Sequence, residues 1–237
     1  MLVLLATVYL VVMLSGNGMA DPDVSYRQFQ PVLSTFEAHQ AHVAAEAQRF
    51  NSVESSIRHS IFQVLATLTG TGFGTADFDV WPRSVSMVLV VLMFFGACAG
   101  STSGGMKLIR IIVGGKAAWR EVKKVVRPHL IAPVKVEKTA LQESMISNIV
   151  GFILLFFILF AGASWLMTFF IDDLTTAVTS VIATLANIGP GLSGVGSTQS
   201  YGWIPLGGKW VLIACMLLGR LEVFTVLVMF RKSFWRR

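Results

Sequence analysis

The chain has 237 residues, of which 54% are hydrophobic and only 14% are charged. A soluble domain carries about 25% charged residues, so this composition excludes an ordinary water-soluble enzyme. The net charge of +6 comes from basic residues at the ends of apolar runs, which is typical of a membrane protein and not of a nucleic-acid-binding one.

The first apolar stretch, residues 1–14, is short for a membrane span. As a helix it would rise ~21 Å, whereas the hydrocarbon core of a bilayer is ~30 Å thick. No Lys or Arg precedes it, so a truncated or tilted span is favoured over a cleaved signal peptide. An outer amphipathic segment is expected over 21–55, with His39 and His42 on its solvated surface.

Two unusual segments follow along the chain. Residues 56–69 are apolar but too short to span a membrane, which favours a re-entrant helix that enters and leaves on one side. Residues 81–113 are too long, since one helix of that length would measure ~50 Å. Four glycines within 96–105 disfavour a continuous helix. We therefore predict a broken second span, with two half-helices joined by a loop at membrane depth.

Charge asymmetry predicts the orientation of these segments. Residues 107–138 hold nine basic and two acidic side chains, whereas 15–83 hold four basic and seven acidic ones. Basic segments lie on the cytoplasmic side of membrane proteins, which explains 107–138 without invoking DNA or lipid binding. Residues 144–171 carry no charge, and 210–230 are interrupted only by Arg220 and Glu222, so both are predicted to span the membrane.

A second short apolar segment, 174–186, matches the first re-entrant segment at a fixed offset of 117 residues. The aligned pairs are VLATL (64–68) with VIATL (181–185), Gly72 with Gly189, and Gly74 with Gly191. Agreement in pattern, spacing and hydropathy favours an internal duplication over coincidence.

The predicted fold is therefore an all-α polytopic membrane protein built from two span–pore-helix–span repeats, each with a glycine filter strand. The first repeat covers 1–127, a cytoplasmic linker covers 128–143, and the second repeat covers 144–237. A half-helix that ends inside the membrane directs the negative end of its dipole at the cavity beyond, which favours cations. Glycine carbonyls can replace the hydration shell of a potassium-sized cation. Ordinary turns between helices are the alternative.

Four runs of the sequence are specific enough to indicate a family. They are TGTGFGTADF (69–78), GSTSGGMK (100–107), NIGPGL (187–192) and GRLEVF (219–224). The chain resembles the C-terminal half of transporters of the Trk/Ktr/HKT superfamily, closest to the bacterial TrkH members. The resemblance implies potassium uptake across the bacterial inner membrane through a pore of four such repeats. It also implies a homodimer and a cytosolic, nucleotide-binding regulatory subunit of the TrkA type, with no cofactor in the chain itself.

The resemblance also assigns site residues by their positions in these runs. The filter residues, whose backbone alone would hold potassium, are Gly70, Thr71, Gly72, Phe73, Asn187, Ile188, Gly189 and Pro190. The gating residues form an intramembrane loop, Gly100, Ser101, Thr102, Ser103, Gly104 and Gly105, together with Arg220 as a positive barrier below the filter. Because the chain carries two filter strands and the family four, a complete pore would need a missing N-terminal half or a second copy.

Other functions stay open at this point. A non-conducting or partner-dependent membrane subunit would carry the same runs, and so would a sodium/potassium transporter of the same family. An intramembrane hydrolase built on Ser101 or Ser103 lacks a histidine in any predicted span, so no catalytic residue is assigned and the chain is not expected to be an enzyme.

Several charged residues have two interpretations. Arg220 either limits cation escape or forms an ion pair with Glu222. The acids at the two outer mouths either concentrate cations there or complement helix dipoles; they are Asp77, Asp79, Asp172 and Asp173.

Overall fold

The computed structural model describes residues 36–50, 52–96, 104–127, 133–136 and 139–220. Three predicted features lie outside these residues: the span at 1–14, the gating residues at 100–103, and the part of the last span that follows Arg220. The described residues are mostly helical, in agreement with the predicted all-α class.

The order of elements follows the apolar runs of the sequence. The helices are α3 (Phe36–Arg49), α4 (Val53–Thr69), α5 (Arg83–Phe94), α6 (Leu108–Val126), α7 (Glu143–Met167), α8 (Leu174–Leu185) and α9 (Leu206–Arg220). Two 3-10 turns, η1 (Ser193–Val195) and η2 (Tyr201–Trp203), lie between α8 and α9. The strands have two residues each: β1 (Phe95–Gly96) is parallel to β2 (Met106–Lys107), and β3 (Lys135–Val136) is antiparallel to β4 (Thr139–Ala140).

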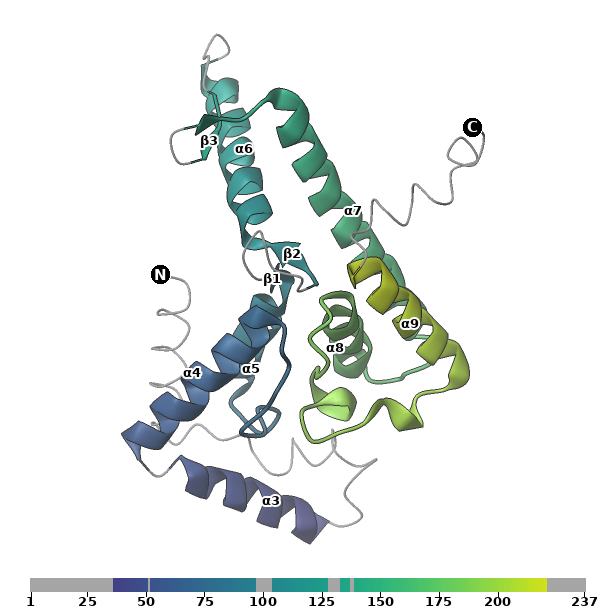
Figure 1. Ribbon diagram of the computed structural model, residues 1–237. Helices are drawn as coiled ribbons and strands as arrows, with labels where there is room; N and C mark the ends of the chain where they lie inside the picture. Colours follow the sequence, from purple (N-terminus) through teal and green to yellow (C-terminus); the bar gives the residue numbers. More distant parts are fainter. Residues whose placement is uncertain (1–35, 51, 97–103, 128–132, 137–138, 221–237) are drawn as a thin grey trace.

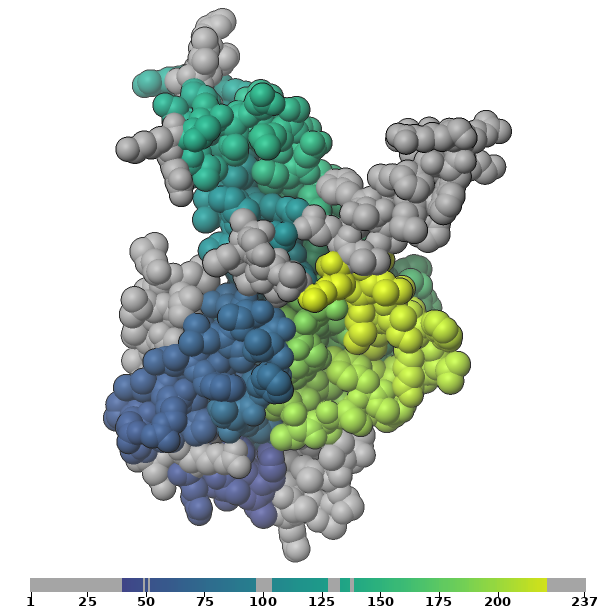
Figure 2. All heavy atoms as spheres, in the orientation of Figure 1, coloured from purple at the N-terminus to yellow at the C-terminus, as the bar shows by residue number. Residues whose placement is uncertain are grey.

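The helices form two packed groups that meet at α8 (Figure 1). Helices α4 and α5 pack against each other, and α5 also contacts α8. On its other sides α8 packs against α7 and α9, while α6 and the first half of α7 extend together away from this cluster. In the space-filling view the blue N-terminal helices lie directly against the green and yellow C-terminal ones (Figure 2).

Helix α8 lies at the centre of the largest core cluster. Val181, Ile182 and Leu185 are completely buried, and they pack among residues of α7 and α9. The buried hydroxyl groups of Thr179, Ser180 and Thr184 donate to carbonyls of the preceding turn, for example Thr184 Oγ1 to Ser180 O at 2.8 Å, and the buried Thr176 hydroxyl donates to the Asp173 carboxylate. The helix can therefore carry polar side chains inside an apolar core without leaving their hydroxyl donors unpaired.

Helix α7 has the length and composition of a membrane span. Its 25 residues are strongly apolar, and among the described helices it alone is both long and apolar enough to cross a bilayer. Large apolar side chains on it, such as Leu154, Ile158 and Trp165, remain more than half exposed. A soluble core helix would bury such side chains, so this surface requires an apolar environment.

The segment 81–113 contains two helices, and the second is longer than expected. Helix α5 ends at Phe94, and α6 begins at Leu108 and continues to Val126 instead of ending at Val113. Residues 116–126 are mostly good helix formers, and the Glu121–Lys124 ion pair at i,i+3 supports the extension. The basic residues from Lys116 to Lys124 therefore lie on the same helix as the predicted half-helix.

Candidate functional site

Helix α4 ends in a glycine turn. Gly70 adopts a left-handed conformation with φ of 70°, and its N–H group donates to the Thr67 carbonyl at 3.2 Å. The N–H groups of Thr71 and Gly72 both donate to the Ala66 carbonyl, at 3.0 and 3.3 Å. Gly72 is also left-handed, with φ of 70°. Glycine adopts this conformation without the steric cost that other residues meet, so the two glycines explain why the helix stops here.

Helix α8 ends in a turn of the same kind. The Asn187 N–H group donates to the Thr184 carbonyl at 3.1 Å, and Asn187 is left-handed with φ of 55°. The N–H groups of Ile188 and Gly189 both donate to the Ala183 carbonyl, at 2.9 and 3.4 Å. Gly189 also has a positive φ, of 111°.

The two turns correspond residue by residue at the 117-residue offset found in the sequence. Each donor and acceptor of the second turn lies 117 positions after its counterpart in the first. The correspondence extends to a side chain, because Thr67 Oγ1 donates to Gln63 O and Thr184 Oγ1 to Ser180 O, both at 2.8 Å. Asn187 takes the place of Gly70, and asparagine is among the few residues that tolerate the left-handed region.

The backbones that follow the two turns lie against each other. A Cβ atom built on Gly72 would overlap the Ile188 carbonyl oxygen and lie 3.1 Å from the Pro190 side chain. The predicted filter residues of the two halves, 114 or more residues apart in sequence, are therefore neighbours in space. Phe73 directs its side chain away from this contact, since 72% of it is exposed.

Tyr201 binds the second turn from the outside. Its hydroxyl donates to the Gly189 carbonyl at 2.6 Å. Burial raises the pKa of Tyr201, so the hydroxyl stays protonated and remains a donor. A carbonyl oxygen has two lone pairs, so the Gly189 carbonyl keeps one for another partner. No local pattern in the sequence identifies this tyrosine.

The described part of the predicted gating loop lies at the carboxyl end of α8. A Cβ atom on Gly104 would lie 2.6 Å from the Ala186 carbonyl oxygen and 2.9 Å from Asn187 Nδ2. A Cβ atom on Gly219, next to Arg220, would overlap the Leu185 carbonyl oxygen. Asn187 Nδ2 also donates to the Met216 carbonyl of α9 at 3.2 Å.

Three parts of the molecule thus converge beneath the second turn. They are the end of the loop at Gly104 and Gly105, the α9 residue Gly219, and the end of α8. The parallel pair β1–β2 fixes the two ends of the loop together, because Phe95 pairs with Met106. Arg220 is the last residue of α9 and is exposed. The loop residues 100–103 and Glu222, the alternative partner of Arg220, lie outside the described residues.

The outer acids do not face solvent as a group, which corrects one of the sequence interpretations. Asp77 is 1% exposed, and its carboxylate accepts hydrogen bonds from Ser197 Oγ and Thr198 Oγ1, both at 3.1 Å. Asp79 Oδ1 accepts the Ser193 N–H group at 2.7 Å. The two acids therefore connect the loop after the first glycine turn to the loop after the second.

Asp173, at the start of α8, follows the helix-dipole interpretation. Asp173 is the N-cap, and its carboxylate accepts the N–H groups of Thr175 and Thr176 at 3.3 and 2.9 Å. Capping of this kind satisfies amide donors that have no partner inside the helix. Asp172 is exposed.

His42 does not lie on an open surface, contrary to the prediction. Its Nε2 atom is 3.6 Å from Asp77 Oδ2, and only 31% of its side chain is exposed. From the same helix, Glu46 Oε2 accepts the Asp77 N–H group at 3.2 Å. Helix α3 is thereby fixed to the loop that follows the first turn. Hydropathy marked α3 as amphipathic but could not identify which residue its polar face contacts.

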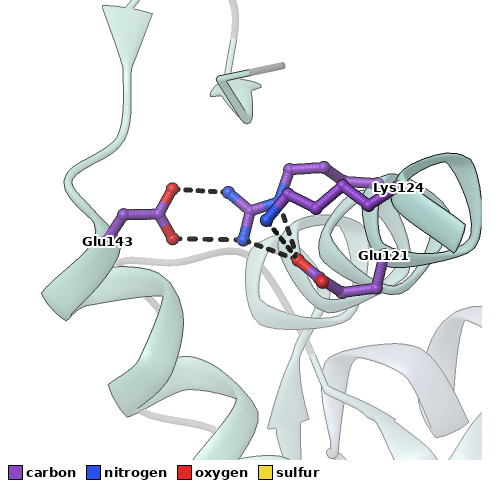
Figure 3. Close-up of polar contacts among 4 residues, drawn as sticks. Glu121, Lys124 and Glu143 are labelled. Atoms are coloured by element: carbon purple, nitrogen blue, oxygen red, sulfur yellow. Dashed lines mark hydrogen bonds and ion pairs between the residues drawn. The ribbon is translucent and has the colours of Figure 1, made fainter. Parts of the chain in front are cut away.

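At the far end of the molecule a bidentate ion pair joins α6 to α7 (Figure 3). Arg120 Nη1 lies 2.5 Å from Glu143 Oε1, and Nη2 lies 3.1 Å from Glu143 Oε2. Glu121 Oε1 accepts from Arg120 Nε and from Lys124 Nζ, both at 3.1 Å. The Lys124 ammonium and the Arg120 guanidinium lower the pKa of Glu121. Next to this cluster lies a mainly apolar cavity of about 950 Å³ between α6 and α7.

We expect Glu143→Gln to separate the ends of α6 and α7. The change removes the charge that holds the guanidinium, and the exposed ion pair should also weaken in 1 M salt. The measurement is the distance between spin labels at Val122 and Met145, which are exposed positions on the two helices. Glu121→Gln is the control, because Glu121 contacts only Arg120 and Lys124 of its own helix through the ion pairs described. Equal distance distributions in both variants would contradict the role of Glu143.

Comparison with known proteins identifies the relatives of this chain. Residues 32–237 match the TrkH family, described as a cation transport protein. The chain is 41% identical over 185 residues to the Trk system potassium uptake protein TrkH of Halomonas elongata, covering 76% of this chain and 37% of that protein. It is 39% identical over 188 residues to the protein of the same name in Escherichia coli, covering 79% of this chain and 38% of that protein.

A solved structure agrees with the sequence matches. The crystal structure of the potassium transporter TrkH from Vibrio parahaemolyticus matches 98% of this chain and 44% of its own length, with a TM-score of 0.71 and 31% sequence identity. The chain thus spans less than half of the length of each of these relatives. The family expected from the sequence is confirmed, and the chain belongs to the TrkH family of cation transport proteins.

Proposed function

We propose that this chain forms half of a potassium pathway in a Trk-type uptake system of a bacterial inner membrane. Its relatives are named potassium uptake proteins, and none of the names indicates an enzyme. The two halves of the chain, 1–127 and 144–237, act as two pore repeats joined by the cytoplasmic linker 128–143. The exposed apolar surface of α7 and the basic end of α6 support this membrane orientation.

The observation that carries the proposal is the matched pair of turns at the ends of α4 and α8. Each turn places a short helix behind a stretch of backbone that is free of helical pairing. The negative ends of both helix dipoles point toward the same region, where Gly72 and Ile188 are in contact. Backbone carbonyls of residues 70–73 and 187–190 would replace the hydration shell of potassium there.

Gating is assigned to the segment beneath the turns. Gly104 and Gly219 approach the end of α8 so closely that neither position has room for a Cβ atom. A loop packed at this point would obstruct an ion leaving the filter, and Arg220 would add an electrostatic barrier. The basic helix α6 leads from this loop to the cytoplasmic side, where a nucleotide-binding regulatory subunit could act on it. The remaining repeats of the pore come from the rest of a longer polypeptide or from a second copy, and the assembly is a homodimer.

The test of this function is potassium uptake by the complete polypeptide in bacterial cells that lack their own potassium uptake systems. We expect growth in low-potassium medium and uptake of labelled rubidium, both of which depend on the membrane potential. Gly115→Ala is a suitable control, since a Cβ atom at Gly115 meets nothing within 4 Å. A complex that assembles in the membrane without carrying potassium or rubidium would instead indicate a non-conducting subunit.

We expect Tyr201→Phe to lower potassium transport severalfold while the protein still accumulates in the membrane. The substitution removes only the hydroxyl that holds the Gly189 carbonyl, and loss of one such hydrogen bond costs about 1 kcal/mol, or about a fivefold effect. Rubidium uptake at equal protein level is the measurement. The control is Ser200→Ala, at the position before η2. Unchanged uptake in Tyr201→Phe would show that the second turn does not need this support.

A further inference from the structure

The two loops beyond the glycine turns are joined by a buried carboxylate bridge, which consists of Asp77 and Asp79 on one side and Ser193, Ser197 and Thr198 on the other. The Ser193 N–H group and the two hydroxyls donate to the carboxylates at 2.7–3.1 Å. Asp77 Oδ1 also accepts the Asp79 N–H group at 3.1 Å, which orients the two acids relative to each other. The bridge connects residues 114 to 121 positions apart in the chain.

The bridge is close to both turns along the backbone. Asp79 follows Gly72 by seven residues, and Ser193 follows Gly189 by four. Ser193 itself is held in the left-handed region, with φ of 59°, and is 2% exposed. The Gly191 N–H group donates to the Val195 carbonyl at 2.7 Å, so the loop between the second turn and Ser193 is closed on itself. A displacement of Ser193 would therefore be transmitted to the second turn.

The first turn has no free space at Gly72 that could absorb such a displacement. A Cβ atom on Gly72 would overlap the Ile188 carbonyl, so the two backbones are already in contact. At the bridge, a Cβ atom on Gly196 would overlap Asp79 Oδ2. The turns are in contact at Gly72 and Ile188, and the loops are in contact at Asp79 and Gly196. A change in the distance between the loops should therefore also change the distance between the turns.

Two buried acids side by side are an unfavourable way to join two loops. Burial, and to a smaller extent the charge of Asp77, raise the pKa of Asp79 well above its usual range. The hydrogen bond from the Ser193 N–H group lowers this pKa but does not offset the increase. Asp79 Oδ2 is buried with no hydrogen-bond partner. An apolar contact between the loops would avoid this desolvation. Unlike an apolar contact, a carboxylate fixes the direction and the distance of each hydrogen-bond donor.

We propose that Asp79, oriented by Asp77, is a positioning residue that sets the separation of the two glycine turns and thereby the discrimination of potassium from sodium. This proposal rests on the proposed function, since it requires that the turns line the ion path. Selectivity by backbone carbonyls depends on the positions and the field of those carbonyls. Asp79 acts through Ser193 and does not itself touch the ion.

The test compares four variants of the complete polypeptide by the ratio of potassium to sodium uptake at equal protein level in the membrane. Asp79→Ala removes the acceptor for Ser193, and Gly196→Ala displaces the carboxylate without changing any charge. We expect both to lower the ratio about fivefold, the effect of losing one hydrogen bond of about 1 kcal/mol. Asp79→Asn keeps the acceptor oxygen and should stay within about twofold of the parent. Asp172→Ala removes an exposed outer acid that takes no part in the bridge and should change nothing.

Each other result overturns the proposal. An unchanged ratio in Asp79→Ala and Gly196→Ala, with or without a lower total flux, would reduce the bridge to a structural contact. A loss in Asp79→Asn equal to that in Asp79→Ala would mean that the negative charge acts on the ion directly. If Asp79→Ala fails to accumulate, Gly196→Ala and the double change Ser197→Ala with Thr198→Val decide the question. The proposed function fails separately, if the parent carries no potassium or if Gly72→Ser leaves its ratio unchanged.

Discussion

Gly72→Ser is expected to reduce the preference for potassium over sodium at least tenfold. A non-glycine residue in the left-handed region costs about 1–3 kcal/mol. The added Cβ atom would also overlap the Ile188 carbonyl, which is backbone and cannot rotate away. The two turns must therefore move apart, and the carbonyls that face the ion move with them. Each 1.4 kcal/mol corresponds to a tenfold change in an equilibrium. Backbone strain and the overlap with Ile188 together should therefore lower the potassium preference at least tenfold.

Gly189→Ala provides an internal comparison for this first prediction. Gly189 has a positive φ of 111°, but a Cβ atom there meets nothing within 4 Å. Its substitution thus adds backbone strain without a collision, and we expect a smaller loss of selectivity than at Gly72. The measurement is the ratio of initial potassium and sodium uptake rates in cells that express each variant. Equal ratios in Gly72→Ser and the parent would remove the first turn from the ion path.

Arg220→Ala is expected to increase potassium flux, as is deletion of residues from the 100–105 loop. One positive charge within about 8 Å of a cation opposes it by about 2 kcal/mol at an effective dielectric constant of 20, equivalent to about a thirtyfold change in rate. Arg220 follows Gly219, which contacts the same end of α8 as Gly104. Removing either the charge or the loop should therefore relieve an obstruction at one place.

Arg220→Lys separates the charge from the shape of the arginine. The lysine variant keeps the positive charge, so its flux should stay close to that of the parent, whereas a contact specific to the guanidinium would be lost. Lys123→Ala, in the basic last turn of α6, controls for a general change in surface charge. Flux that falls or stays constant in both Arg220→Ala and the shortened loop would contradict the gating assignment.

The parts of the fold that the sequence predicted correctly are those with a local cause. Glycine at 70 and 72 ends α4, and the glycines between 96 and 105 separate α5 from α6, because glycine disfavours helix whatever surrounds it. The 117-residue offset predicted a second turn at the end of α8, and the hydrogen bonds of the two turns correspond. The end of α6 was predicted at Val113, thirteen residues before its actual end at Val126. The prediction followed the end of the apolar run, but the helix continues through the basic residues beyond it.

The contacts that join the two halves had no local cause to detect. Asp79 and Ser193 are 114 residues apart, and neither carries a hydropathy or spacing signal that relates it to the other. Two contacts within a single half, Tyr201 with Gly189 and His42 with Asp77, likewise have no such signal. Tertiary contacts of this kind follow from the packing of whole helices, so the sequence pattern could place Asp77 and Asp79 near an outer mouth but could not identify their partners.

The burial of α8 has a consequence for how the chain enters the membrane. Its 12 residues rise only ~18 Å and include four buried hydroxyl side chains, so the helix is too short and too polar to partition into lipid alone. The helices that enclose it, α7 and α9, lie on either side of it in the chain. We therefore expect α8 to enter the membrane stably only after α9 has been made. A ribosome stalled before α9 would leave α8 without its enclosure, and such an intermediate is the one that membrane quality-control proteases should recognise.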